Sequence, residues 1–164
     1  MGLPGYRLVN ILGLLGCCTA MGFALYLQHV VGLEPCPLCI LQRVAVIAAA
    51  LVLVLAIAHN PKAVGQRVYA LLGLFASLGG LGVAGRHVWL QHIPADQVPA
   101  CGPGLDYMLD VFPMKDVLSM VLRGSGECAV VDWRFMGFSL AELTLLVFVG
   151  LFVLFLFQLL RQRG

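Results

Sequence analysis

Four long stretches without a charged side chain constrain what this chain can fold into. They cover residues 8–33, 44–61, 68–85 and 143–160, and the shortest contain 18 residues. Eighteen helical residues rise about 27 Å, close to the roughly 30 Å of a bilayer's hydrocarbon core. None shows the polar residue at every third or fourth position that a water-facing helix needs. The sequence therefore predicts an all-α membrane protein, a four-transmembrane-helix bundle with cores near 8–28, 40–59, 67–86 and 140–160.

The composition excludes several other classes of protein. With 61% hydrophobic and 11% charged residues, the 164-residue chain has too little polar surface for a soluble globule. The net charge of +2 argues against nucleic acid as a partner. Uncharged spans argue against solute or metal transport. Leu14 to Cys17 resembles a lipoprotein processing site, but the apolar sequence continues to Leu27, which favours an uncleaved span. We expect one integral membrane domain, residues 1–164.

The placement of charge predicts the orientation of the bundle in the membrane. One side would carry only basic residues: Arg7, Lys62, Arg67, Arg161 and Arg163. The other would carry all eight acidic residues with the remaining five basic ones. Because cytoplasmic segments are enriched in Lys and Arg, both termini are expected in the cytoplasm. Loops at about 29–39 and 87–139 would then face outward, into the periplasm if the membrane is a bacterial inner membrane.

The longer outward loop has patterns of its own. Apolar residues from Met114 to Leu122 recur at helical spacing, which predicts a short amphipathic helix on the membrane surface. Segments 102–104 and 124–126 are interpreted as flexible flanks of two cysteines. Trp89, Tyr107, Trp133 and Phe135 are interpreted as membrane-interface anchors. In the third span, small residues at positions 73, 76, 77, 80 and 84 predict close helix packing.

The six cysteines fall into two groups. Cys17 and Cys18 lie within the first span, where a thiol usually packs as a small apolar group. Cys36, Cys39, Cys101 and Cys128 lie on the predicted outward side, where an oxidising compartment favours disulfides. Two cysteines in each loop suggest the pairs Cys36–Cys39 and Cys101–Cys128, among three possible connectivities.

Cys36-Pro37-Leu38-Cys39 is the most specific motif in the chain. Its spacing places two sulfurs within bonding reach at the first turn of a helix, and Pro37 suits the first helical position. A helix N-terminus favours a thiolate, so we interpret the motif as a redox pair. Zinc is the main alternative, but the sequence offers no second ligand pair at zinc-binding spacing, and we predict no metal. A purely structural disulfide is the other alternative.

Arg43 lies on the same predicted helix face as Cys36 and Cys39. Many arginines near the end of a span only anchor the helix at the interface. Next to a dithiol, however, a fixed cation can stabilise a thiolate or polarise the carbonyl oxygen of a bound electron acceptor. The shared face favours the functional interpretation.

The four spans, the motif through Arg43 and the second outward cysteine pair resemble the DsbB family of bacterial disulfide bond formation proteins. The resemblance covers nearly the whole chain. It implies an inner-membrane thiol:quinone oxidoreductase that reoxidises a periplasmic DsbA-like, thioredoxin-fold oxidant. The cofactor would be ubiquinone or menaquinone from the membrane pool. By position, Cys101 and Cys128 match the pair attacked by the partner, Cys36 and Cys39 the pair that reduces quinone, and Arg43 the quinone-associated arginine. Arg86, His87, Gln91 and His92 are further candidates for quinone contact.

Two other interpretations of the whole chain remain open at this point. A tetraspan scaffold with structural disulfides would use the same cysteines for folding alone. A quinone reductase similar to vitamin K epoxide reductase is also small, helical and membrane-bound, but there the C-x-x-C motif follows the loop cysteines. Here the motif precedes them.

Overall fold

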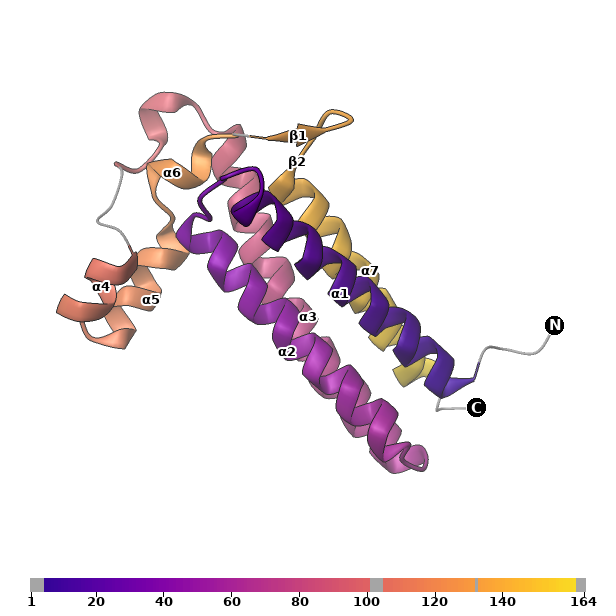
Figure 1. The fold of residues 1–164 in the computed structure, drawn as a ribbon. Coiled ribbons are helices and arrows are strands. Elements are labelled where there is room, and N and C mark those ends of the chain that lie inside the picture. The colour runs from indigo at the N-terminus through magenta and orange to yellow at the C-terminus, as the bar shows by residue number, and fades with distance from the viewer. Residues whose placement is uncertain (1–4, 101–104, 132, 162–164) are drawn as a thin grey trace.

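Four long helices form the body of the protein in the computed structural model, which describes residues 5–100, 105–131 and 133–161. They are α1 (Tyr6–His29), α2 (Pro37–His59), α3 (Ala63–His92) and α7 (Leu140–Arg161). Each is long and apolar enough to cross a membrane. Neighbours in the chain pack side by side, α1 on α2, α2 on α3 and α3 on α7 (Figure 1). This confirms the predicted all-α four-helix bundle.

The smaller elements gather at one end of the bundle. Between α3 and α7 lie η1 (Ala95–Gln97), α4 (Leu105–Val111), α5 (Met114–Arg123) and α6 (Gly126–Ala129). A short antiparallel pair follows, β1 (Arg134–Phe135) with β2 (Phe138–Ser139). We call this the loop end, and the opposite end, which holds the α2–α3 connection, the turn end (Figure 1). Helix α3 continues to His92, past its predicted end at residue 86, so the long connection begins later than expected.

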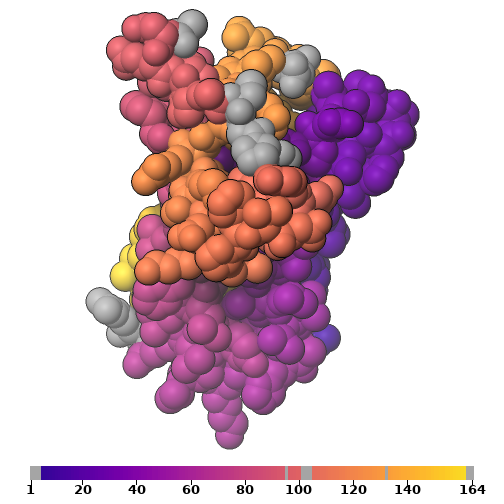
Figure 2. Space-filling view, turned by 90° about the vertical axis from the view of Figure 1, so that its left-hand side faces the viewer, coloured from indigo at the N-terminus to yellow at the C-terminus, as the bar shows by residue number. Residues whose placement is uncertain are grey.

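Helix α5 confirms the predicted short amphipathic helix. Val117 and Val121 are buried in a cluster with Leu38 of α2 and Leu90 of α3. Met114, Leu118 and Leu122 are exposed, which suits contact with a lipid surface. Figure 2 shows α4 and α5 lying across the face of the bundle formed by α2 and α3. The cluster joins the connection to the membrane-spanning helices.

The small residues of α3 pack against aromatic rings of α7, as their spacing predicts. A Cβ added to Gly73 would lie 2.1 Å from Phe155 Cε1, and one added to Gly80 would lie 2.0 Å from Phe148 Cε1. Both rings are fully buried. Glycine is therefore required where each ring enters α3, and the two helices approach closely. Cys17 is buried in the same core, whereas Cys18 is exposed.

A buried polar pair joins α1 and α7 near the turn end. The side-chain amide of Gln158 donates to Asn10 Oδ1 at 3.0 Å, and Asn10 Nδ2 donates to the Tyr6 carbonyl oxygen at 3.0 Å. Asn10 and Gln158 are both buried. Their polar groups satisfy one another, as apolar surroundings require.

Candidate redox site at the loop end

The Cys36–Cys39 motif forms the first turn of α2. Cys36 is the N-cap, Pro37 occupies the first turn as predicted, and the Cys39 N–H donates to Cys36 Sγ at 3.4 Å. Both residues are free thiols with their sulfurs 3.0 Å apart. A disulfide requires about 2.05 Å between sulfurs, so a small side-chain movement would bring this pair within bonding distance.

Helix α6 brings Cys128 to the same place. Its thiol is fully buried and lies close enough to Cys36 that the contact between the two thiols affects the pKa of both. Gly124, which precedes α6, has φ +80°, and an added Cβ would lie 2.2 Å from Leu90 Cδ1. Gly124 therefore lies in a closely packed turn that positions Cys128. The interpretation of residues 124–126 as a flexible flank does not describe this turn. Cys101 and residues 102–104 lie outside the described residues, so the Cys101–Cys128 pairing stays a prediction.

The contact between Cys36 and Cys128 shifts the pKa values of the two thiols in opposite directions. It is the main cause that lowers the pKa of Cys128 from 9.0 to about 6, with further hydrogen bonds from Ser125 and the Leu38 backbone. The same contact with Cys128, followed by the contact with Cys39 and burial, raises the pKa of Cys36. The helix N-terminus was expected to favour a thiolate in the Cys36–Cys39 pair. Cys36 is not that thiolate, because a second negative charge next to the Cys128 thiolate is unfavourable.

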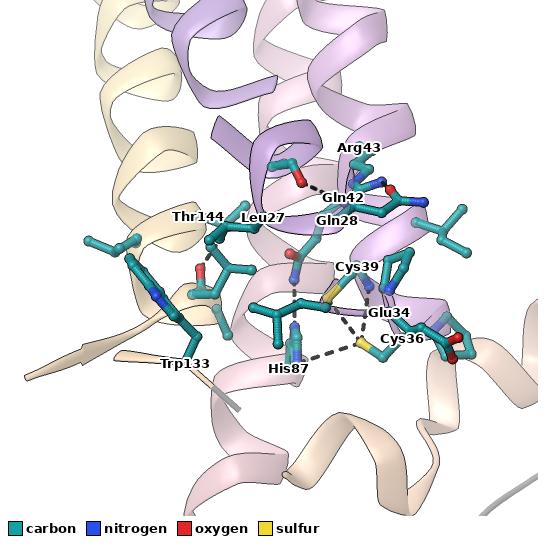
Figure 3. Close-up of a pocket in the computed structure, with 18 of the residues that line it drawn as sticks. Leu27, Gln28, Glu34, Cys36, Cys39, Gln42, Arg43, His87, Trp133 and Thr144 are labelled. Carbon is teal, nitrogen blue, oxygen red and sulfur yellow. Dashed lines mark hydrogen bonds between the residues drawn. The ribbon is translucent and has the colours of Figure 1, made fainter. Parts of the chain in front are cut away.

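His87 and Gln42 extend this cluster into the bundle. His87 Nε2 lies 3.8 Å from Cys36 Sγ, and His87 Nδ1 lies 3.1 Å from the side-chain nitrogen of Gln42 (Figure 3). Both side chains are buried, with exposed fractions of 4% each. Gln42 therefore fixes the imidazole ring so that Nε2 faces the thiols.

The other three candidates from α3 lie apart from the thiols. Arg86 is placed over the Trp89 ring at 4.2 Å and donates to the Arg123 carbonyl oxygen. His92 is exposed, close to the Val88 carbonyl oxygen and to Glu142. Gln91 accepts a hydrogen bond from Ser139 and borders the pocket described below. Arg86 and His92 do not line that pocket.

Arg43 crosses from α2 to α1. Its guanidinium donates to the Gln28 side chain and, at 3.2 Å, to the Ala24 carbonyl oxygen (Figure 3). These contacts hold the cation at the wall of the pocket, one turn below Cys39. The predicted grouping of Arg43 with the cysteine motif is therefore present in the fold.

A pocket of about 890 Å³ opens beside these groups, between α1, α2, α3 and α7. Its size lies within the usual range for small-molecule sites, roughly 300 to 1,000 Å³. Apolar side chains from α1 and α7 line one side, including Met21, Leu27, Leu143 and Val147. Cys36, Cys39, Arg43 and His87 line the other. Such a cavity can hold a flat apolar ring whose polar atoms face the thiols and the cation.

Three contributors to the site escaped the sequence analysis. Gln42 and Gln28 hold His87 and Arg43, and both are polar residues near the ends of apolar spans, a signal that could have marked them. Trp133 was interpreted as an interface anchor. It also lines the pocket, with its ring centroid 5.4 Å from that of Phe23.

Comparisons with known proteins place the chain in a family. A profile of the family described as "Disulfide bond formation protein DsbB" matches residues 6–158. Disulfide bond formation protein B of Nitrosococcus oceani is 54% identical over 158 residues, covering 96% of this chain and 94% of the relative. The protein of that name from Acinetobacter baumannii is 55% identical over 157 residues, covering 95% and 92%. The chain is a multi-pass membrane protein that belongs to the DsbB family, and this membership supports a role in disulfide oxidation.

Proposed function

We propose that this protein is a thiol:quinone oxidoreductase that reoxidises a periplasmic DsbA-like, thioredoxin-fold oxidant. The observation that carries the proposal is the meeting of Cys36, Cys39 and Cys128 with His87, at the edge of a pocket large enough for a quinone ring. A structural disulfide needs neither the pocket nor the cation beside it.

The first step is exchange with the partner protein. Cys101 and Cys128 form a disulfide in the resting oxidised enzyme, and a partner thiolate attacks the sulfur of Cys101. Cys128 is the leaving group, because its complete burial blocks attack on its own sulfur. A thiol whose pKa is lowered to about 6 also leaves readily as a thiolate. The partner's second thiolate then attacks the mixed disulfide, so that the partner is oxidised and Cys101 is released reduced.

The second step is exchange within the protein. The Cys128 thiolate attacks Cys36 Sγ of an oxidised Cys36–Cys39 pair, and Cys39 leaves as a thiolate. The closeness of Cys128 to Cys36, which shifts the pKa of both thiols, supports this direct path. The thiolate of Cys101 then attacks Cys128, which restores the Cys101–Cys128 disulfide and leaves Cys36 and Cys39 as the reduced pair. No net oxidation occurs in this step.

The residues around the pocket suit a quinone. When bound, a quinone accepts two electrons and two protons from the Cys36–Cys39 dithiol and leaves as quinol. Arg43, held by Gln28 and Ala24, would place a cation beside the carbonyl oxygen that gains negative charge. His87, oriented by Gln42, would hold or pass the proton of Cys36. Ubiquinone and menaquinone both fit this chemistry.

The proposed orientation follows from charge. The inner membrane of a bacterium would hold the bundle with both termini and the α2–α3 connection in the cytoplasm. The basic residues of the turn end and the eight acidic residues elsewhere support this placement. The loop end, with its thiols, would then meet the oxidising periplasm and the partner protein.

The test is quinone reduction by purified full-length protein supplied with a reduced thioredoxin-fold partner. We expect loss of quinone absorbance with stoichiometric oxidation of the partner, in parallel assays with ubiquinone and menaquinone analogues. Cys36→Ser should reduce turnover to the rate without enzyme, while Cys18→Ser, which alters an exposed thiol of α1, should keep full turnover. Full activity of a quinone-replete Cys36→Ser protein would overturn the proposal. Loss of folding rather than turnover in that variant would favour the scaffold.

A further inference from the structure

Three metal-binding atoms from two helices converge beside the pocket. They are Cys36 Sγ, Cys39 Sγ and His87 Nε2 or Nδ1, and the three donor atoms lie within 4.8 Å of one another. The two sulfurs are 3.0 Å apart, and Cys36 Sγ is 3.8 Å from His87 Nε2. A tetrahedral ion bound at about 2.3 Å from sulfur and 2.0 Å from nitrogen separates its donors by roughly 3.5 to 3.8 Å. The observed distances bracket this range, so small side-chain rotations bring all three onto one ion.

The partner of His87 is of the kind that metal-bound imidazoles have. A ligating histidine uses one ring nitrogen for the ion and the other for a hydrogen bond that fixes the ring. Here Gln42 occupies the Nδ1 side at 3.1 Å, which leaves Nε2 facing the sulfurs. With the Gln42 amide turned so that its oxygen accepts from Nδ1–H, the lone pair of Nε2 is available to a cation.

The described residues supply three of the four ligands of a tetrahedral ion. Cys128 lies near Cys36, but its sulfur is not among the three donor atoms that lie within 4.8 Å of one another. The site therefore has three protein ligands and an open fourth position, as some zinc sites do. With Cys36 and Cys39 ionised, the two thiolates balance the charge of a divalent ion. The sequence argument against zinc concerned ligand spacing, and the fold supplies His87 of α3 as a ligand that lies far from the motif in the chain.

We propose that the reduced form of this cluster binds a thiophilic divalent cation such as Zn²⁺, with Cys36, Cys39 and His87 as ligands. Binding releases the protons of the two thiols and involves no oxidation. While the ion holds both sulfur lone pairs, Cys36 and Cys39 cannot form their disulfide, so the ion acts as an inhibitor that favours the reduced state. This inhibitory effect rests on the proposed function, but the binding itself does not.

The test uses Co²⁺ as a spectroscopic probe of the full-length protein in detergent, after reduction with a phosphine that is then removed. Reduced wild-type protein should show thiolate-to-cobalt charge-transfer absorption that saturates at one equivalent and is displaced by Zn²⁺. Protein with its cysteines oxidised should show none. Cys39→Ser should abolish the band. His87→Gln should weaken Co²⁺ binding about tenfold or more. Cys18→Ser and His59→Ala, distant residues of the same types, should leave the spectrum unchanged.

The outcomes separate this proposal from the proposed function. No charge-transfer band in the reduced protein, or an unaltered band in Cys39→Ser, would overturn the metal site even if quinone turnover is normal. A band with the expected dependence on variants supports the site even if no quinone is reduced. Where both hold, Zn²⁺ added to the reduced enzyme should slow turnover, and a chelator should restore it. The circular dichroism of each variant checks that a lost band does not reflect lost helix.

Discussion

The protein contains two buried polar pairs of similar geometry, and they differ in what surrounds them. Near the turn end, Gln158 and Asn10 meet at 3.0 Å in a fully packed interior. At the loop end, Gln42 and His87 meet at 3.1 Å, and His87 also faces a thiol and a pocket of about 890 Å³. The first pair has its polar groups satisfied within the protein. The second pair leaves Nε2 of His87 directed at the Cys36 thiol. A neighbouring pocket and a neighbouring nucleophile therefore distinguish this functional pair from the structural one.

The same contrast exists in the packing. Along α3 and α7, glycines admit the rings of Phe155 and Phe148, and no added atom fits. At the loop end the four helices leave a cavity lined by thiols, a cation and apolar groups. We call the close contact of α3 with α7 the packed seam. Because this seam supplies tight packing between two of the helices, the bundle does not require equally tight packing around the pocket. The predictions that follow test this division, from the largest expected effect to the smallest.

Removing the Cys36 thiol should change the acidity of Cys128. In Cys36→Ala the contact that favours the Cys128 thiolate is absent, so the pKa of Cys128 should rise from about 6 toward the 9.0 of a free thiol. At pH 7 its ionised fraction would fall from roughly nine-tenths toward the value of about one-hundredth for a free thiol, while Ser125 and the Leu38 backbone retain part of the shift. In the reduced wild type the thiolate should be lost as the pH falls through about 6.

The measurement is the ultraviolet absorbance of thiolate in reduced protein with a chelator present. In the Cys36→Ala background, the contribution of Cys128 is the absorbance lost when Cys128→Ala is added. This loss is compared with the absorbance lost when Cys128→Ala is introduced into the wild type. Cys18→Ser provides a control for a distant exposed thiol. If Cys128 still titrates near 6 without Cys36, the loop end does not couple these thiols.

A methyl group at Gly73 should destabilise the packed seam. The Cβ of Gly73→Ala would lie 2.1 Å from Phe155 Cε1, and the buried ring has little room to move. Overpacking of this kind costs about 2 kcal/mol, roughly thirtyfold in the unfolding equilibrium. Gly82→Ala is the matched control, since nothing lies within 4 Å of its Cβ position. Thermal unfolding in detergent compares the two variants. Equal stability would show that the contact between α3 and α7 accommodates a methyl group at Gly73.

The sequence predicts the membrane-spanning architecture better than it predicts the site. Charged side chains are excluded from the hydrocarbon core, so long uncharged stretches mark the segments that lie in lipid. The positions of the charged residues alone therefore predict four spans. The small-residue spacing of Gly73 and Gly80 also predicts a close helix contact, although the sequence does not identify Phe155 and Phe148 as the partners. Local motifs such as Cys36-Pro37-Leu38-Cys39 predict a helix start because the determinants lie within one turn.

The site depends on contacts between residues far apart in the chain. Nothing in the sequence around His87 distinguishes it from His92, yet the first faces Cys36 and the second is exposed. The two residues lie five positions apart on the continuous helix α3, so their side chains leave it in directions about 140° apart, and packing decides which direction meets α2. The reversed acidity of Cys36 and Cys128 likewise depends on their contact across the fold. An argument from the helix N-terminus considers α2 alone and omits a neighbour such as Cys128 from another part of the chain.

Gln42→Leu should impair turnover without loss of the bundle. The substitution removes the hydrogen bond that orients His87, a loss of about 1.4 kcal/mol, or roughly tenfold in the rate of quinone reduction. Since Gln42 acts through His87, the Gln42→Leu and His87→Gln effects should not add in the double variant. Gln42→Glu, which can still bond His87 Nδ1, should recover part of the rate. Additive losses would mean that Gln42 acts on the pocket independently of His87.

The smallest expected effect is at the turn end. Gln158→Leu removes the hydrogen bond to Asn10, but each side chain sits in a bundle whose main stabilisation is packing. Hydrogen bonds between membrane helices average about 0.6 kcal/mol, so the unfolding equilibrium should shift only about threefold. Quinone turnover should remain at the wild-type rate, because the pair is remote from the thiols and the pocket. Unfolding in detergent and the quinone assay, run on the same preparation, measure both quantities. A loss of turnover as large as that of Gln42→Leu would mean that the two polar pairs are coupled along the bundle and that the loop end does not act alone.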